Sequence, residues 1–162
     1  MQKRISDMPP LLGAGVHSVT IEWIREHCVL AFPLSSSRQP ILDGFMRLIR
    51  QLEAEKIPCD VIVDGSYFTE EIDPLDIDLS VCVTPEFYES CTISQLSTLE
   101  WIRDSFQIKT THLCDAYLCV EYPEGHPDWY EGVQNRAFWV NLFSKSTIHK
   151  RIRGVGMLAL KA

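Results

Sequence analysis

Two aspartates, Asp76 and Asp78, flank a single residue at the beginning of a predicted strand. Residues i and i+2 of a strand point to the same side, with Cα atoms about 7 Å apart. The two carboxylates therefore share one face, and apolar residues occupy the other: Ile77, Leu79, Val81 and Val83. Adjacent carboxylates repel each other, and a bound divalent cation removes that repulsion. The pair predicts a site for a hard metal ion.

A glycine-serine turn precedes this pair. The apolar run Val61–Val63 predicts a buried strand that leads into Asp64, Gly65 and Ser66. Glycine lets the backbone approach a ligand closely, and the amide and hydroxyl of serine can donate to phosphate oxygens. We interpret Gly65 and Ser66 as a phosphate-binding turn.

Asp115 is the candidate for a third carboxylate. It lies between Cys114 and Ala116 in a predicted strand over residues 113–122. If this strand pairs beside the one that carries Asp78, the Asp115 side chain can reach the same metal. It would then hold one ion and act as the base for an incoming hydroxyl. The alternative is an ordinary solvated strand carboxylate.

Together these residue types suit metal-dependent nucleotidyl transfer. That reaction needs charge neutralisation on a triphosphate and activation of an attacking hydroxyl, and two Mg²⁺ ions about 4 Å apart supply both. Mg²⁺ prefers oxygen ligands and accepts only a few from the protein. Asp76, Asp78 and Asp115 are the predicted ligands.

The order glycine-serine, Gly65-Ser66, followed by Asp76-Ile77-Asp78 resembles the signature of the DNA-polymerase-β-type nucleotidyltransferase superfamily. It is most similar to the short bacterial members, which include minimal nucleotidyltransferases that act as antitoxins beside toxins. The resemblance covers mainly residues 58–120. It implies a nucleotidyltransferase-like palm, two Mg²⁺ ions, an NTP donor such as ATP, and transfer of NMP to a protein, an RNA or a small molecule.

The loop after the turn departs from that signature. Nine residues separate Ser66 from Asp76, one fewer than in the minimal members, and the loop carries Glu70 and Glu71 where those members often have Arg or Lys. Acidic groups near a triphosphate weaken its binding. The basic residues expected to compensate are Lys150, Arg151 and Arg153, near the C-terminal end.

The charge of −7 over 162 residues is unevenly distributed. Residues 132–162 contain six Lys or Arg and no Asp or Glu. An acidic body argues against simple coating of DNA, whereas the basic end can receive a phosphate, an RNA or an acidic partner, or balance the acidic body within the chain.

Length and composition predict one domain, residues 1–162, with residues 1–16 as an extended lead-in and 46% hydrophobic residues for a core. The sequence contains no apolar run of about 18 residues, so no membrane span is predicted, and the N-terminus does not resemble a secretory signal. The six cysteines form no C-x-x-C pair, which favours buried thiols in a cytoplasmic protein.

The elements that position these residues follow from periodicity and caps. Helices are predicted from Thr20 toward Val29, over residues 41–56, from Thr84-Pro85 onward with a stronger part over 93–106, and over 136–143. A last strand is predicted around Gly154–Leu160. Strands joined by helices predict an α/β (α+β) fold with a mixed sheet and helices packed on it.

Two other functions remain open from the sequence. The acidic, shortened loop suits an interaction protein on the same fold, an antitoxin or an antiviral defence component, with weak or no catalysis. The basic end suits an RNA-binding module. Oligomers are possible, since an acceptor pocket can require a second subunit. His17 and His126 are possible acid/base groups, but loop histidines such as these are more often structural.

Overall fold

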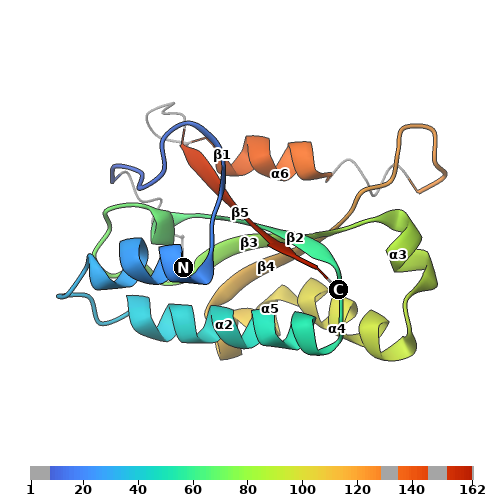
Figure 1. Ribbon diagram of the computed structural model, residues 1–162, viewed down its shortest axis with the longest axis horizontal. Helices are drawn as coiled ribbons and strands as arrows, with labels where there is room; N and C mark the ends of the chain where they lie inside the picture. The colour runs from blue at the N-terminus through green and yellow to red at the C-terminus, as the bar shows by residue number, and fades with distance from the viewer. Residues whose placement is uncertain (1–7, 129–134, 146–152, 162) are drawn as a thin grey trace.

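The structure is a computed structural model, and it describes residues 8–128, 135–145 and 153–161. Within these residues five strands form one sheet in the order β1-β5-β2-β3-β4 (Figure 1). Their bounds are β1 (Gly15–Ser18), β2 (Cys59–Asp64), β3 (Ile77–Val83), β4 (Cys114–Val120) and β5 (Gly154–Leu160).

The sheet is mixed. β2 pairs antiparallel with both β3 and β5, whereas β4 lies parallel to β3 and β1 lies parallel to β5. The short loop between β2 and β3 joins antiparallel neighbours, and the parallel β4 requires the helical crossover that follows β3. As a result, the end of β2 and the beginnings of β3 and β4 lie at the same end of the sheet.

Helical segments account for most of the remaining described chain. They are α1 (Ile21–Ile24), which continues as the π-helix η1 (Arg25–Leu30), α2 (Arg38–Ala54), the 3₁₀ turn η2 (Ser66–Phe68), α3 (Pro85–Ser90), α4 (Ile93–Arg103), α5 (Ser105–His112) and α6 (Arg136–Phe143). Side chains that accept hydrogen bonds from backbone amides cap several starts: Thr20, Thr84, Thr92 and Asn135.

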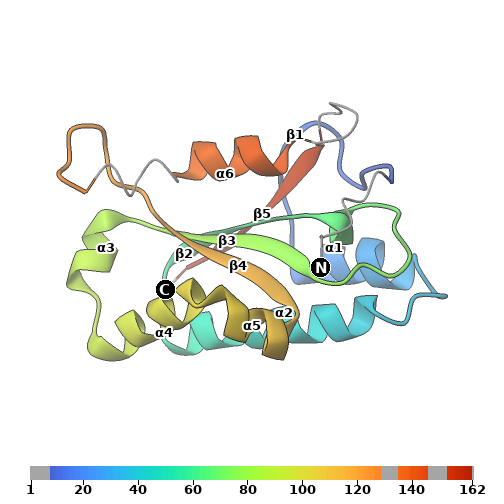
Figure 2. The ribbon, with the colours of Figure 1, turned by 180° about the vertical axis from the view of Figure 1, so that it is seen from behind.

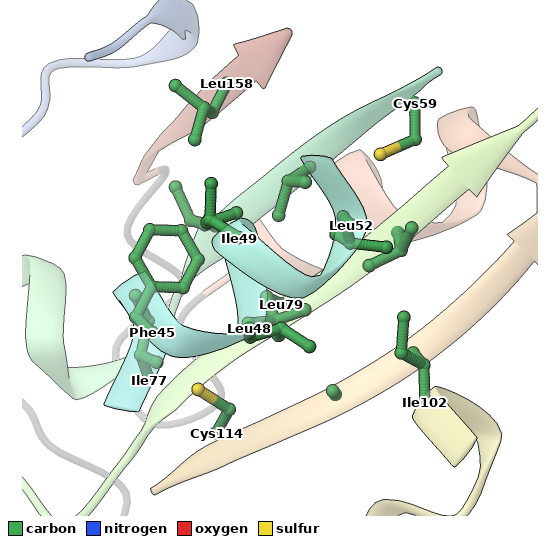
Figure 3. Close-up of a cluster of buried hydrophobic side chains, with 14 of the residues drawn as sticks. Phe45, Leu48, Ile49, Leu52, Cys59, Ile77, Leu79, Ile102, Cys114 and Leu158 are labelled. Carbon is green, nitrogen blue, oxygen red and sulfur yellow. The ribbon is translucent and has the colours of Figure 1, made fainter. Parts of the chain in front are cut away.

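The main core lies between one face of the sheet and helices α2, α4 and α5 (Figures 1 and 2). The buried stripe of α2 faces this core with Phe45, Leu48, Ile49 and Leu52 (Figure 3). The apolar side of β3 meets it, so Ile77 and its alternate neighbours are buried as their period predicts. Gly44 allows α2 to approach α5: a Cβ at this position would lie 1.9 Å from the carbonyl oxygen of His112.

Helix α6 covers the opposite face of the sheet (Figure 2). A smaller apolar cluster fills this layer and consists of Ile62, Cys82, Cys119, Trp139 and Val155. Asp64, Asp78 and Asp115 lie on the same face as this cluster, because each is an even number of residues from one of its strand members. The carboxylates are therefore on the thinly covered side of the sheet.

The predicted mixed α/β (α+β) fold is confirmed, and α6 and β5 have the predicted bounds. Three predicted elements differ in detail from the structure. The lead-in over residues 1–16 contains the start of strand β1, which is short and largely exposed and so has little apolar alternation. The helix predicted over 93–106 ends at Arg103, and a separate helix α5 follows; Ile108 is its one buried residue, so its apolar period is weak.

Helix α2 also begins earlier than predicted, at Arg38 rather than Ile41, with Pro40 in its first turn. Among the described residues, no helix has the length and apolar character needed to cross a membrane.

Candidate functional site

Three carboxylates align across three adjacent strands. Asp64, the last residue of β2, pairs with Asp78 of β3, and Asp78 pairs in turn with Asp115 of β4. Directly paired residues of neighbouring strands point to the same face. The sheet therefore places a row of three acidic side chains at one end. The row runs across the strands, so the spacing of these residues along the sequence does not reveal it.

Asp76 joins this row through Lys109. Asp76 immediately precedes β3 and is 2% exposed. The Lys109 ammonium, from helix α5, lies 2.9 Å from Asp76 Oδ2 and 3.3 Å from Asp115 Oδ2. Burial lowers the pKa of Lys109, but the two carboxylates outweigh it and hold that pKa above its usual value. One cation thus bridges two of the predicted metal ligands.

Asp64 is the most deeply buried of the three strand aspartates in the row, at 3% exposure. Burial, with a smaller contribution from the charge of Asp78, raises the pKa of its carboxyl to about 8. The Gly65 backbone amide and the Arg153 guanidinium act in the opposite direction, since both favour the charged form. Arg153 is itself buried, with 8% exposure, so its guanidinium is packed into this end of the sheet.

Gly65 lies against the carboxylate of Asp78. Its φ is +93°, and a Cβ built on it would lie 2.1 Å from Asp78 Oδ2. Only glycine leaves room for this carboxylate and adopts the backbone angle without strain. The turn and the acidic row are therefore in contact.

Replacing Gly65 with alanine should lower the free energy of unfolding by about 2 kcal/mol or more, through backbone strain and the displaced carboxylate. Gly125→Ala is a matched control, because Gly125 has a φ of +90° but nothing within 4 Å of its Cβ position. Urea unfolding of both variants measures the difference. Equal losses would show that the Asp78 contact contributes nothing.

The segment after the turn is anchored by Arg38, whose side chain is fully buried. Its guanidinium lies 3.8 Å from the centre of the Phe32 ring and donates five hydrogen bonds to backbone carbonyls. Four of these bonds reach the loop between β2 and β3, at Tyr67, Thr69 and Glu71. Arg38 therefore determines the path of the loop that links the turn to the acidic pair.

Asp73 anchors the far part of the same loop. Its Oδ1 accepts hydrogen bonds from the backbone amides of Ser36 and Ser37 and from the hydroxyls of Ser35 and Ser36. These bonds, led by the one from the Ser36 amide, lower the pKa of Asp73. The serine-rich loop before α2 thus holds the loop that carries Glu70 and Glu71.

The structure brings together the predicted ligands Asp76, Asp78 and Asp115, and it places Gly65 and Ser66 at the same end of the sheet. Arg153 lies close enough to Asp64 to act on its charge. The other two predicted basic residues, Lys150 and Arg151, lie outside the described residues.

Two residues of this site were missed by sequence reasoning. Asp64 directly precedes Gly65, but its partnership with Asp78 depends on the antiparallel register of β2 and β3. Lys109 belongs to helix α5, where its sequence neighbours carry no motif. The sequence offered a signal for Asp64 alone, because an acidic residue at the end of a buried strand is unusual. It offered none for Lys109.

The donor set suits a hard divalent cation. Asp78 and Asp115 are paired residues of β3 and β4 beside the Gly65 turn, and the Lys109 ammonium contacts both Asp76 and Asp115, so this position favours positive charge. Among the described residues, the oxygens of the three carboxylates do not all lie within 4.8 Å of one another, so a shared ion would draw the side chains together. Carboxylate oxygens are the ligands that Mg²⁺ prefers, and about one or two carboxylates together with substrate phosphates are sufficient.

Comparison with known proteins identifies one family. Residues 6–161 match the model of the family of unknown function DUF6932. No curated protein and no solved structure matches the chain. Because the match spans nearly the whole sequence, the chain belongs to the DUF6932 family.

Proposed function

We propose that this protein is a Mg²⁺-dependent nucleotidyltransferase that moves NMP from an NTP, with ATP as the expected donor, to a hydroxyl of a protein, an RNA or a small molecule. The observation that carries the proposal is the alignment of Asp78 with Asp115 on adjacent strands, with Asp76 linked to Asp115 through Lys109. The contact between Gly65 and Asp78 supports it, because it joins the turn to the carboxylates.

Each residue has a definite task under this proposal. Asp76 and Asp78 would hold both ions, and Asp115 would hold one, accept the proton of the acceptor hydroxyl and so favour its attack. Bound Mg²⁺ supplies charge neutralisation on the triphosphate. The Gly65 turn and the Ser66 hydroxyl and amide would hold phosphate oxygens, and the resemblance to the polymerase-β-type superfamily implies the same assignment.

Arg153 supports a phosphate role for the C-terminal region. Its positive charge acts on Asp64, which lies at the same end of the sheet as the Gly65 turn. Lys150 and Arg151 precede it in the sequence, and the proposal assigns them to the same anionic substrate. Their charges would offset Glu70 and Glu71 in the neighbouring loop.

The proposal is tested by titrating the full chain with ATP in the presence of Mg²⁺ and observing heat by calorimetry. Saturable binding that disappears when EDTA is added is the expected result, because carboxylates and triphosphate repel each other without the metal. Absence of binding at millimolar nucleotide would contradict the proposal. Incubation with labelled NTPs and a cell lysate then asks which macromolecule receives the label.

Lys109 gives a second, independent measure of the metal site. Replacing Lys109 with methionine removes the cation that bridges Asp76 and Asp115, so the metal-free protein should lose stability. Mg²⁺ should bind about tenfold more tightly, a change of about 1.4 kcal/mol, because it no longer competes with the ammonium. Thermal unfolding with increasing Mg²⁺ measures both effects.

Lys56→Met changes the net charge equally but lies in the turn after α2, so it is the control. If Mg²⁺ stabilised the Lys109 variant, the control and the unmodified chain to the same extent, Lys109 would not compete with a metal.

Lys109 also favours an alternative function. An ammonium between Asp76 and Asp115 can replace the metal, and with the acidic Glu70 and Glu71 nearby the chain would be an inactive or weak relative that binds a protein partner, such as a toxin. This alternative predicts that neither Mg²⁺ nor ATP changes thermal stability. The calorimetric titration described above therefore separates the two functions.

The proposal includes a cytoplasmic setting, which six free cysteines support because reducing compartments preserve thiols.

A further inference from the structure

Two cysteines and a glutamate converge at the other end of the sheet. Cys82 of β3 and Cys119 of β4 are paired residues of neighbouring strands, and Glu121 follows Cys119 by two positions on the same face. One ligand atom from each of the three lies within 4.8 Å of the other two. Four positions of β3 separate Cys82 from Asp78, about 13 Å along the strand, so this group is distinct from the acidic row.

A cavity of about 260 Å³ reaches this group, with Cys82, Glu121, Asp60 and Arg136 among the residues that line it. Both thiols are buried, with 2% exposure for Cys82 and 1% for Cys119. The cavity therefore provides an entry path to a donor set that is otherwise enclosed by helix α6 and its apolar neighbours.

We propose that Cys82, Cys119 and Glu121 form a binding site for a thiophilic divalent cation, with Zn²⁺ as the chemical class that fits best. Two sulfur donors and one carboxylate oxygen match the ligands that Zn²⁺ takes in proteins, and they do not match Mg²⁺. In a tetrahedral arrangement with Zn–S bonds of about 2.3 Å, neighbouring ligand atoms lie about 3.8 Å apart, so a group within 4.8 Å needs only small adjustments.

Asp60 and Arg136 complete the surroundings of this site. Asp60 pairs with Cys82 across β2 and β3, and its carboxylate or a water can take the fourth ligand position. The Arg136 guanidinium contacts Asp60 Oδ2 at 2.5 Å and Glu121 Oε1 at 2.7 Å. Two thiolates and two carboxylates around one divalent ion carry a charge of −2, and Arg136 offsets half of it.

The thiols must lose their protons when the metal binds. The hydrogen bond that the Cys119 thiol shares with Cys82, together with burial, raises the pKa of Cys119, so this thiol is protonated without metal. A bound divalent ion favours the thiolates directly, and the two protons pass to the solvent. Binding should accordingly release about two protons per metal and weaken as pH falls.

The test is a titration of the reduced full chain with Co²⁺, after removal of metals with a chelator. Thiolate-to-cobalt charge-transfer absorption with the visible bands of tetrahedral cobalt is the expected result, and one equivalent of Zn²⁺ should remove both. Excess Mg²⁺ should leave them unchanged, because Mg²⁺ does not compete for sulfur. A titration without thiolate absorption overturns the proposal on its own.

Variants locate the site. Cys82→Ser and Cys119→Ser should each lose the charge-transfer band, and Glu121→Gln should weaken Co²⁺ binding about tenfold or more. Cys114→Ser is the matched control, since Cys114 lies on β4 but faces the core beneath α2 (Figure 3). Loss of the band in Cys114→Ser, or its survival in Cys119→Ser with the fold intact by circular dichroism, would contradict the assignment.

This site does not depend on the proposed enzymatic function. The double variant Asp76→Asn/Asp78→Asn should bind Co²⁺ at the thiols with unchanged affinity. Loss of the band in that variant would instead show that the two ends of the sheet form one metal system, and it would overturn the distinct site proposed here.

Discussion

Replacing Asp76 and Asp78 together with asparagine should abolish nucleotidyl transfer while the fold is retained. Asparagine keeps the shape of each side chain but removes the negative charge that holds Mg²⁺. We expect the rate to fall by more than about a thousandfold, as for loss of a principal electrostatic stabiliser. The binding of Mg²⁺-ATP should fall with it, and calorimetry measures this without knowledge of the acceptor.

Stability should change little in this variant. Asp76 loses its charge interaction with Lys109, but the mutual repulsion of the acidic row is relieved at the same time. Asp43→Asn is a control for the loss of one negative charge, here on the exposed side of α2. Retained transfer or retained metal-dependent ATP binding in the double variant would show that the acidic row is not the active site.

Replacing Arg38 with methionine should lower the free energy of unfolding by about 3–5 kcal/mol. The guanidinium satisfies four backbone carbonyls, those of Cys28, Tyr67, Thr69 and Glu71, and methionine cannot donate to any of them. Each carbonyl left without a donor in a buried position costs about 1–3 kcal/mol, partly recovered where the loop moves toward water. Urea unfolding measures the loss.

Arg47→Met is the control for this experiment. Arg47 lies on the same helix and donates to the Thr111 carbonyl, but it does so at the surface. We expect a loss of about 1 kcal/mol or less for Arg47→Met. Arg38→Lys should recover only part of the stability, since an ammonium cannot reproduce the planar fork of five donors.

Arg38 also has a functional consequence. Three of the four carbonyls belong to the loop that follows Gly65 and Ser66, so Arg38→Met should weaken Mg²⁺-ATP binding as well as stability. Arg38→Met with nearly unchanged stability would mean that the loop is held by other contacts, chiefly those of Asp73. The anchoring role of Arg38 would then be incorrect.

The two metal proposals use opposite ends of one sheet and opposite kinds of donor. The acidic row at the end of β2 offers oxygen alone, whereas the group at the start of that strand combines sulfur with a carboxylate. The two sites can therefore be distinguished in a single sample, because the thiolate-to-cobalt charge-transfer band reports only on the cysteines, whereas stabilisation by Mg²⁺ reports on the carboxylates.

Much of this architecture could be predicted because it depends on local period. The stripe of α2, the alternation of β3, and the bounds of α6 and β5 all follow from the spacing of apolar residues along a short stretch of chain. The prediction that Asp76 and Asp78 share a face used the same period, but Asp76 lies one residue before β3, where it contacts Lys109 of α5.

Helix α5 and strand β1 could not be predicted, because neither has a clear apolar period in its own sequence. α5 buries only Ile108, and β1 is mostly exposed, so neither has a strong pattern of its own. Both depend on neighbours distant in sequence: α5 contacts α2 and β4, and β1 pairs with β5. A short element with few buried residues is stabilised by tertiary contacts rather than by propensity.

By itself the sequence determined the types of the reactive residues and the strand that carries Asp78. Only the tertiary structure decided that Asp64 and Asp115 flank Asp78, that Lys109 bridges two carboxylates, and that Cys82 meets Cys119. These relations depend on strand register and on a helix packed from another part of the chain. Register is set by the burial of whole strands against the core, and no local spacing encodes it.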